Sequence, residues 1–343
     1  MKRTRAAAKI QQQNTIEKNK NDEETASKIQ TTSMVVNERQ KLNFKSLQKQ
    51  NSKNACDTSD PHITAASKKS KNNQKGPNTE IRIEEGEKLG PNTSPGKGKL
   101  RAVVDLQMMK KELSQLEDPP VTPWEKELSS NRLQYDFFDT PCEELAQQLL
   151  GKILVRYLEN GTILKGRIVE TEGYLGAIDK ASQTYQNKIT PRNLPMYMPP
   201  GTIYVYMTYG MYHCFNISSQ GDGCAVLVRA IEPLEGITHM VDQRNTSKTR
   251  KTNLKPHEQL CNGPSKLCIA YQLNKEHSRY SLCTWKGLWL EDDGAAGDFK
   301  IVKSARIGID SCGSEWANKP LRFYVYGNKS VSKRDKKAEM ETS

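Results

Sequence analysis

The chain has 343 residues, a formal net charge of +12 and a pI near 9.2. No run approaches the roughly 18 apolar residues that span a bilayer, and no apolar signal segment follows the basic start. The 8 cysteines form no C-x-x-C pair and show no zinc or iron–sulfur spacing, so we expect a soluble, unsecreted protein without such a metal centre.

Aromatic residues are nearly absent from the first third of the chain, where only Phe44 precedes Trp124. A segment of this kind cannot bury enough apolar surface to offset the entropy of ordering. We predict a disordered basic tail over residues 1–125, in which residues 103–116 form one short amphipathic helix that docks a partner or frays. The positive charge favours nucleic acid first and an anionic membrane second, although a merely solvated tail fits it as well.

The first elements predicted after the tail are a helix and a hairpin. Thr140-Pro141-Cys142-Glu143 supplies an N-cap hydroxyl, a proline at the first helical position and a glutamate at the third, and Gly151 ends the helix. Residues 152–158 and 162–172 have strand composition and flank Asn160-Gly161, a strong hairpin signal. We expect these two strands to pair antiparallel.

A second hairpin is predicted over residues 202–219, with Tyr209 near its tip, because alternating residues are interrupted there by Tyr209-Gly210. The other predicted elements are a strand at 225–231, helices from Pro233 and over 264–273, and strands at 299–307 and 321–326. Strands outnumber helices and join through hairpins, which predicts an α+β fold. We expect one compact domain over 126–332, mostly antiparallel sheet with surrounding helices and a protruding β-hairpin, and a disordered C-terminal tail over 333–343.

Two carboxylates and an aromatic ring share one face of a predicted strand end. Period-two geometry directs Glu170, Glu172 and Tyr174 to the same side, which suits a general base beside a stacking surface. This pentapeptide alone is more typical of a strand end whose acids face water. Both interpretations therefore stand at this point.

Five of the 13 tyrosines lie between residues 196 and 216. Tyrosine rings stack on bases at about 1–3 kcal/mol each, and a ring at a hairpin tip, such as Tyr209, can enter a groove as a wedge. For Tyr197, Tyr204 and Tyr212, packing in the core is an equally good interpretation.

Positive side chains lie in neighbouring segments. Arg192 and Arg229 supply guanidinium groups, and Lys266 stands at a predicted helix start, where backbone N–H groups also favour a phosphate. The sequence contains no G-x-S-x-G nucleophile motif, phosphate loop or dinucleotide fingerprint.

Five segments follow one another with compatible spacing: GRIVETEGY (166–174), TPRN (190–193), MPPGTIYVYMTYGMYHCFNISSQGDG (198–223), VRAIEPLEG (228–236) and NGPSKLC (262–268). Together they closely resemble the alkyladenine (3-methylpurine) DNA glycosylase family of eukaryotic type. The resemblance covers roughly residues 133–330. It implies a compact mixed α/β domain that pushes a β-hairpin into the minor groove of double-stranded DNA and hydrolyses the N-glycosidic bond of a flipped, damaged purine.

The resemblance also implies roles for single residues. Glu172 is similar to the catalytic base that activates water, and Arg229 to the arginine beside that water and the DNA backbone. Tyr174 and Tyr206 are similar to the rings that sandwich the flipped base, and Tyr209 to the intercalating wedge. The other predicted contacts are Gln183, Tyr204 and Asn216 with the base, where Asn216 crowds the 2-amino group of guanine, and Met211, Arg192 and Lys266 with DNA.

The chemistry agrees with these roles. A base inside a duplex hides its glycosidic bond, so the base must be flipped and a wedge must fill the gap. Alkylated purines such as 3-methyladenine carry positive charge, which makes them good leaving groups and good partners for tyrosine faces. We expect 3-methyladenine and 7-methylguanine as substrates, hypoxanthine and ethenoadenine as further candidates, and no metal or other cofactor.

Two positions depart from the family pattern. Gln183 stands where the family usually has histidine, so a stacking ring is lost and the range of neutral substrates is in doubt. Gly173 replaces the more usual alanine, which is a smaller change.

Two alternatives remain: a non-catalytic binder of distorted nucleic acid, and a glycosylase with lyase activity through a lysine Schiff base.

We expect the protein to be a monomer. We also expect it in the nucleus, with a minor mitochondrial pool, because basic clusters at residues 2–9 and 68–75 suit nuclear import. Residues 1–125 are expected to be dispensable for excision.

Overall fold

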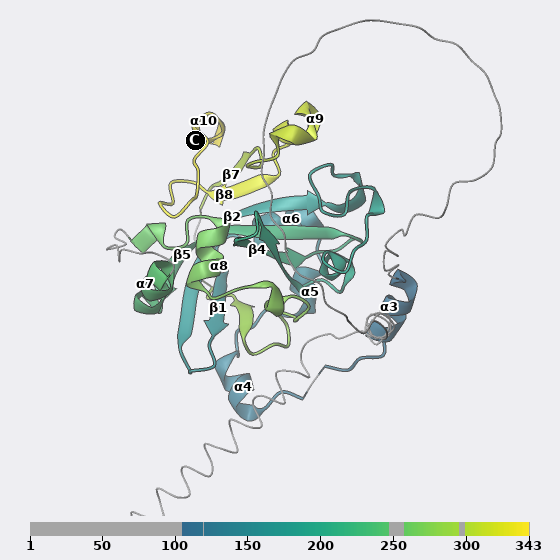
Figure 1. Ribbon diagram of the computed structural model, residues 1–343. Coiled ribbons are helices and arrows are strands. Elements are labelled where there is room, and N and C mark those ends of the chain that lie inside the picture. The colour runs from purple at the N-terminus through teal and green to yellow at the C-terminus, as the bar shows by residue number, and fades with distance from the viewer. Residues whose placement is uncertain (1–104, 119, 247–256, 295–298, 343) are drawn as a thin grey trace, which may run out of the picture. The chain divides into compact units, whose positions relative to one another are not determined.

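The computed structural model describes residues 105–118, 120–246, 257–294 and 299–342 (Figure 1). Its helices are α3 (Leu106–Leu113), α4 (Pro123–Leu128), α5 (Tyr135–Phe138), α6 (Cys142–Gln148), α7 (Ile237–Thr246), α8 (Pro264–Ala270), α9 (Ser314–Asn318) and α10 (Lys336–Thr342). Its strands are β1 (Ile153–Tyr157), β2 (Ile163–Leu175), β3 (Ile203–Thr208), β4 (Tyr212–Ser218), β5 (Cys224–Glu235), β6 (Leu288–Glu291), β7 (Ile301–Ser304) and β8 (Arg322–Val325).

The described strands form one curled sheet in which the paired strands run antiparallel. Its main order is β3-β4-β5-β2-β1-β6, while β8 pairs with β2 and β7 pairs with β8. The two longest strands, β2 and β5, lie side by side at the centre of this arrangement (Figure 1). The predicted α+β fold with a mostly antiparallel sheet is confirmed.

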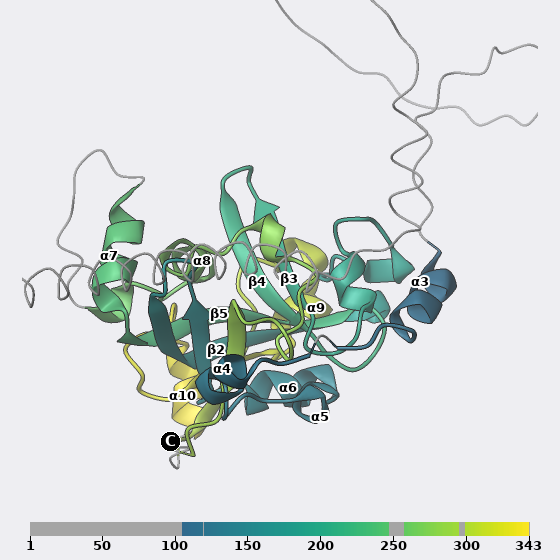
Figure 2. The ribbon, with the colours of Figure 1, turned by 90° about the horizontal axis from the view of Figure 1, so that it is seen from below.

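Both predicted hairpins form, each with left-handed residues at its turn. Gly161 has a φ of +82°, and the Thr162 N–H donates to Asn160 Oδ1 at 3.1 Å, which closes the turn between β1 and β2. At the other turn, Tyr209 and Gly210 have φ values of +51° and +71°. Figure 2 shows the β3–β4 hairpin projecting away from the side of the domain that carries α5 and α6.

One face of the sheet packs against helices. Buried residues of this face, such as Phe215, Val226 and Val228, belong to one apolar cluster with Leu145 of α6 and Leu267 of α8. Because side chains alternate along a strand, the residues between them point to the opposite face. That opposite face carries the site described below.

The helix at 142–148 forms as predicted, but its start differs from the prediction. The Thr140 hydroxyl donates to the carbonyl of Phe137 at 3.2 Å instead of capping the helix, and the N-cap residue is Pro141. The predicted helix from Pro233 is wrong at its start, because residues up to Glu235 continue β5 and α7 begins at Ile237. Pro233 pairs with Gly166 next to a register shift, where a missing N–H is tolerated.

The predicted tail over 1–125 is wrong for its last 20 or so residues, from Asp105 onward. In α3, the Met109 side chain is 1% exposed, and Lys110 Nζ lies 2.7 Å from Asp222 Oδ1, so this helix docks on its own chain. Residues 1–104, with both basic clusters, lie outside the described residues. No helix among the described residues is long and apolar enough to cross a membrane.

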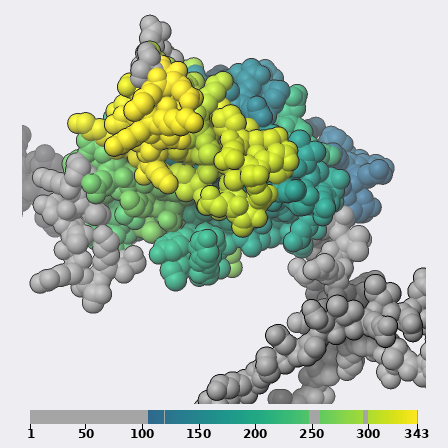
Figure 3. All heavy atoms as spheres, turned by 90° about the horizontal axis from the view of Figure 1, so that it is seen from above, coloured from purple at the N-terminus to yellow at the C-terminus, as the bar shows by residue number. Residues whose placement is uncertain are grey.

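The predicted disordered C-terminal tail over 333–343 is also wrong for the residues that the structure describes. Helix α10 is held by Glu339, which accepts hydrogen bonds from Arg334 (2.8 Å) and from the Tyr324 hydroxyl (3.2 Å). Figure 3 shows the C-terminal residues, in yellow, packed against the surface formed by the segments just before them in the chain. The folded domain therefore extends beyond residue 332.

Candidate active site

Four strands bring predicted site residues into one row across the sheet. Tyr204 of β3 lies opposite Asn216 of β4, Asn216 lies opposite Leu227 of β5, and Leu227 lies opposite Glu172 of β2. Directly opposed residues of neighbouring strands point to the same face. The sheet register alone therefore gathers residues that are separated by up to 55 positions in the sequence, counted from Glu172 to Leu227.

Glu172 lies at the β2 end of this row, and its side chain is 0% exposed. Its Oε1 accepts the Ile307 N–H at 2.8 Å and lies 3.1 Å from Arg229 Nη1, while its Oε2 accepts the Tyr174 hydroxyl at 2.9 Å. The interpretation in which this acid faces water is therefore wrong. A buried carboxylate needs such donors, because removing it from water is otherwise costly.

Arg229 bridges the two acids of the strand end. Besides Glu172, it contacts Glu170, whose Oε1 lies 3.2 Å from Arg229 Nε. Burial by itself lowers the pKa of Arg229, but the charges of Glu172 and Glu170 outweigh burial and raise this pKa above its usual value, so the guanidinium stays charged. Glu170 and Glu172 thus lie on the same face, as predicted.

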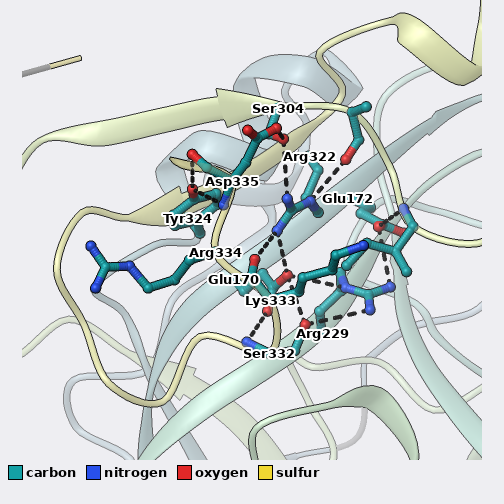
Figure 4. Close-up of polar contacts among 12 residues, drawn as sticks. Glu170, Glu172, Arg229, Ser304, Arg322, Tyr324, Ser332, Lys333, Arg334 and Asp335 are labelled. Atoms are coloured by element: carbon teal, nitrogen blue, oxygen red, sulfur yellow. Dashed lines mark hydrogen bonds and ion pairs between the residues drawn. The ribbon is translucent and has the colours of Figure 1, made fainter. Parts of the chain in front are cut away.

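Glu170 is anchored to the C-terminal part of the chain (Figure 4). It accepts hydrogen bonds from Arg322 Nη1 at 2.9 Å, from the Ser332 N–H at 2.7 Å and from the Ser332 hydroxyl at 2.9 Å. Arg322 also donates to the carbonyl of Lys333 at 2.8 Å. The second acid therefore has its acceptor positions filled by the protein, whereas Glu172 lies beside the predicted base-binding rings.

Two tyrosine rings stand next to Glu172. Tyr174 and Tyr206 are both half-buried. Burial, followed by the charge of Glu172, raises the pKa of Tyr174 well above 10, so this hydroxyl stays protonated and donates to the acid. Burial also raises the pKa of Tyr206. These rings are suited to hold a flat ligand over the carboxylate.

The ring of Tyr204 packs against the ring of Tyr206. Its side chain is 1% exposed, and the centroids of the two rings are 5.3 Å apart. Tyr204 packs with Met196 and Ala225 in a small apolar cluster. Its burial favours the core-packing interpretation, and direct contact of Tyr204 with a base stays a prediction.

Asn216 and Gln183 occupy different environments. Asn216 is buried and donates from Nδ2 to the carbonyls of Tyr204 (3.1 Å) and Cys214 (3.3 Å). Gln183 has an exposed side chain, and its carbonyl accepts a hydrogen bond from Asn193 Nδ2 at 2.9 Å. The main chain at Gln183 is thus fixed by the TPRN segment, while its side chain meets solvent.

The hairpin tip presents apolar side chains to solvent. Tyr209 is 87% exposed and Met211 is 66% exposed. The positive φ of Tyr209 is uncommon for a bulky residue and costs on the order of 1 kcal/mol, with no packing contact of the ring to offset it. This geometry is what a wedge requires, and the wedge role of Tyr209 stays a prediction.

The other two predicted DNA contacts already have protein partners. Arg192 Nη2 donates to the carbonyl of Met207 at 2.8 Å, and its guanidinium carbon lies 5.1 Å from the ring centroid of Tyr206. Lys266 Nζ donates to Asn262 Oδ1 at 2.7 Å near the start of α8. Both remain predictions as phosphate contacts.

The pattern that describes the methylpurine-DNA glycosylase family matches residues 136–329. The chain belongs to this family. It is 50% identical over 214 residues to the human DNA-3-methyladenine glycosylase, covering 62% of this chain and 71% of the relative. The mouse protein of the same name is 49% identical over 214 residues, with 61% and 64% covered. A putative 3-methyladenine DNA glycosylase of Alkaliphilus oremlandii is 43% identical over 205 residues, 59% of this chain and all of the relative.

Sequence reasoning missed several residues that complete the site. Ile307, Arg322 and Ser332 contact Glu172 or Glu170 from 135 to 162 positions away. No local motif marks them, because Ile307 donates a main-chain N–H, Ser332 donates its N–H and its hydroxyl, and Arg322 is one arginine among many in the sequence.

At Gly173, an added Cβ would lie 3.5 Å from Cys142 Sγ, an ordinary contact, so the exchange with alanine is mild. Among the described residues, no group of three or more His, Cys, Asp or Glu side chains could hold a metal ion.

Proposed function

We propose that this protein is a monofunctional DNA glycosylase that hydrolyses the N-glycosidic bond of flipped alkylated purines in base excision repair. Family membership and the mammalian relatives, whose sequences are about 50% identical to this chain, support glycosylase activity on methylated purines. The observation that carries the residue assignment is the environment of Glu172, which is buried between Arg229, the Ile307 N–H and the Tyr174 hydroxyl.

Glu172 acts in two ways in this proposal. As the base, it accepts a proton from the water that attacks the sugar carbon, while the bond to the purine breaks and the purine leaves with the bonding electrons. Its negative charge also stabilises the positive charge that develops on the sugar, and burial strengthens this effect because the local dielectric constant is low. Arg229 holds the carboxylate in place and lies beside the water and the DNA backbone.

Tyr174 and Tyr206 sandwich the flipped base. Their electron-rich faces attract a cationic purine more than a neutral one, at about 0.5–2 kcal/mol for each ring. This favours 3-methyladenine and 7-methylguanine, with hypoxanthine and ethenoadenine as further substrates. Tyr209 fills the gap in the duplex with Met211 beside it, Asn216 discourages normal guanine, and Gln183 narrows the range of neutral substrates.

We further propose that the protein acts as a monomer on double-stranded DNA that contains damaged purines. Arg192 and Lys266 exchange their present partners for phosphates when DNA binds. The protein acts in the nucleus, with a minor mitochondrial pool. The basic clusters at 2–9 and 68–75 support this location by their charge.

A single-turnover assay tests the proposed activity. Duplex oligonucleotides with one lesion each are incubated with excess protein in EDTA. We expect a free base and an alkali-labile abasic site, with no adduct after borohydride treatment. Tight lesion binding without base release would instead support the non-catalytic binder, and a trapped covalent adduct would support the lyase.

A further inference from the structure

A fully buried ion pair lies next to the predicted base-binding ring. Arg306 and Asp179 are both 0% exposed, with Nη1 2.5 Å from Oδ2 and Nη2 2.9 Å from Oδ1. Asp179 also accepts the N–H groups of Leu175 at 3.1 Å and Ala181 at 2.9 Å. Arg306 donates in addition to the carbonyl of Gly173 at 2.9 Å. The pair is thus tied to both ends of the segment that holds Tyr174.

The guanidinium of Arg306 stacks on Tyr174. Its central carbon lies 4.7 Å from the ring centroid. Arg306 follows β7, which joins the sheet through β8 on one side of β2, whereas Tyr206 lies on β3, beyond β5 and β4 on the other side of β2. This strand order puts Arg306 on the side of β2 away from Tyr206, and in the proposed function the base lies on the Tyr206 side of the Tyr174 ring.

This position makes the charge of Arg306 relevant to the lesion. A base stacked on Tyr174 lies roughly 3.5–4 Å from the ring, so the charge of a cationic purine would be about 8 Å from the guanidinium. At an effective dielectric constant of about 20, repulsion between these two positive charges would weaken binding roughly thirtyfold relative to a neutral purine. Such a penalty would remove the advantage that tyrosine faces give to a cation.

We propose that Asp179 is a specificity-determining residue, whose carboxylate cancels the charge of Arg306 behind Tyr174 and so allows the site to accept a cationic purine. Arg306 positions the ring, and Asp179 makes that support electrically neutral toward the lesion. The inference rests on the proposed function and adds to it a residue that touches neither base nor DNA.

The proposal predicts changes of opposite sign for the two partners. Asp179→Asn leaves a buried cation behind Tyr174 and should lower the preference for a cationic lesion about tenfold to thirtyfold. Arg306→Gln leaves a buried anion and should raise that preference by a similar factor. The double variant is neutral again and should return close to the parent. Asp179→Glu keeps the charge and should leave the preference within about threefold of the parent.

We measure the preference from affinity and not from the maximal excision rate. A neutral purine must be protonated as it leaves, and this protonation affects the maximal rate, whereas it does not affect binding of the lesion. The half-saturating protein concentration is measured in single-turnover excision of duplexes that carry 3-methyladenine or hypoxanthine. The preference is the value for hypoxanthine divided by that for 3-methyladenine. Both values come from one preparation, so a reduced folded fraction cancels in the ratio.

Each outcome decides the matter. Opposite shifts in the two single variants, reversed in the double variant, support the proposal. Equal losses on both lesions, or shifts of the same sign, would overturn it and leave the pair a purely structural role. If one single variant yields no folded protein, the sign of the other still decides. A parent protein that releases neither base would refute the proposed function instead.

Discussion

Arg229 Nη1 lies 3.1 Å from Oε1 of Glu172, within the interior of the domain. The same arginine contacts Glu170 at 3.2 Å, so one cation is shared by two acids with different surroundings. Glu170 is held by Arg322 and Ser332 from the C-terminal part of the chain, while Glu172 faces the tyrosine rings. Glu170 therefore anchors the C-terminal segment, and Glu172 is the acid that we propose as the catalytic base.

Glu170→Gln should be destabilising. The amide cannot balance Arg322 and Arg229, and leaving buried cations without their partner costs about 3 kcal/mol in the free energy of unfolding. Urea denaturation measures this loss. Ser332→Ala is the matched control, because it removes one hydroxyl donor to the same acid and should cost about 1 kcal/mol. A loss below about 0.5 kcal/mol for Glu170→Gln would show that this acid does not anchor the C-terminal segment.

Tyr209→Ser tests the wedge. Unstacking a base costs a few kcal/mol per step, and an exposed ring at the hairpin tip offsets part of that cost. Excision of a correctly paired lesion should fall at least about tenfold, while a mispaired or unstacked lesion should be affected less. Single-turnover rates on matched duplexes measure both. Equal losses on the two substrates would argue against insertion of Tyr209.

Gln183→His tests the departure from the family pattern. A neutral purine depends more on stacking and fit than a cationic one, so the restored ring should raise excision of hypoxanthine by several-fold and that of 3-methyladenine less. The two lesions are compared side by side under single-turnover conditions. If both respond alike, or if the parent already removes hypoxanthine as fast as 3-methyladenine, Gln183 does not set the substrate range.

Two truncations distinguish the contribution of residues 1–104 to stability and excision from that of residues 105–125, which include the docked helix α3. A chain that begins at residue 126 loses the burial of Met109 and the contact between Lys110 and Asp222, which should lower the free energy of unfolding by about 2 kcal/mol. A chain that begins at residue 105 keeps both contacts and should match the full-length protein. Excision per folded molecule at low salt should be unchanged in both. A large loss of excision in the shorter, folded chain would show that residues 105–125 take part in the reaction.

Elements with strong local signals could be predicted from the sequence. Asn160-Gly161 marked the first hairpin, and period-two alternation marked the second with Tyr209 at its tip. The predicted capping box at Thr140 does not form, whereas the same Thr-Pro-x-Glu pattern at Thr122 does, with Glu125 accepting the N-cap N–H at 3.0 Å. A capping motif thus shows where a helix can begin, and tertiary contacts decide whether its side chains are used.

The rest of the site depends on long-range contacts that local patterns do not encode. The ends of the domain were missed because α3 and α10 are short helices held by single anchors such as Met109 and Glu339. The partners of Glu170 and Glu172 come from β8 and from residues 307 and 332, brought near by sheet pairing. The resemblance to a family supplied the roles of Glu172 and Tyr206, and the structure supplied their environment.

The most direct measurement is single-turnover excision and lesion binding by Glu172→Gln, with Glu235→Gln at an exposed position of β5 as the control. The amide keeps the size of the side chain but cannot accept a proton from water, so excision of 3-methyladenine should fall at least about a hundredfold while lesion-bearing DNA is still bound. The control should retain both properties. Near-normal excision by Glu172→Gln would contradict the assignment of Glu172 as the catalytic base.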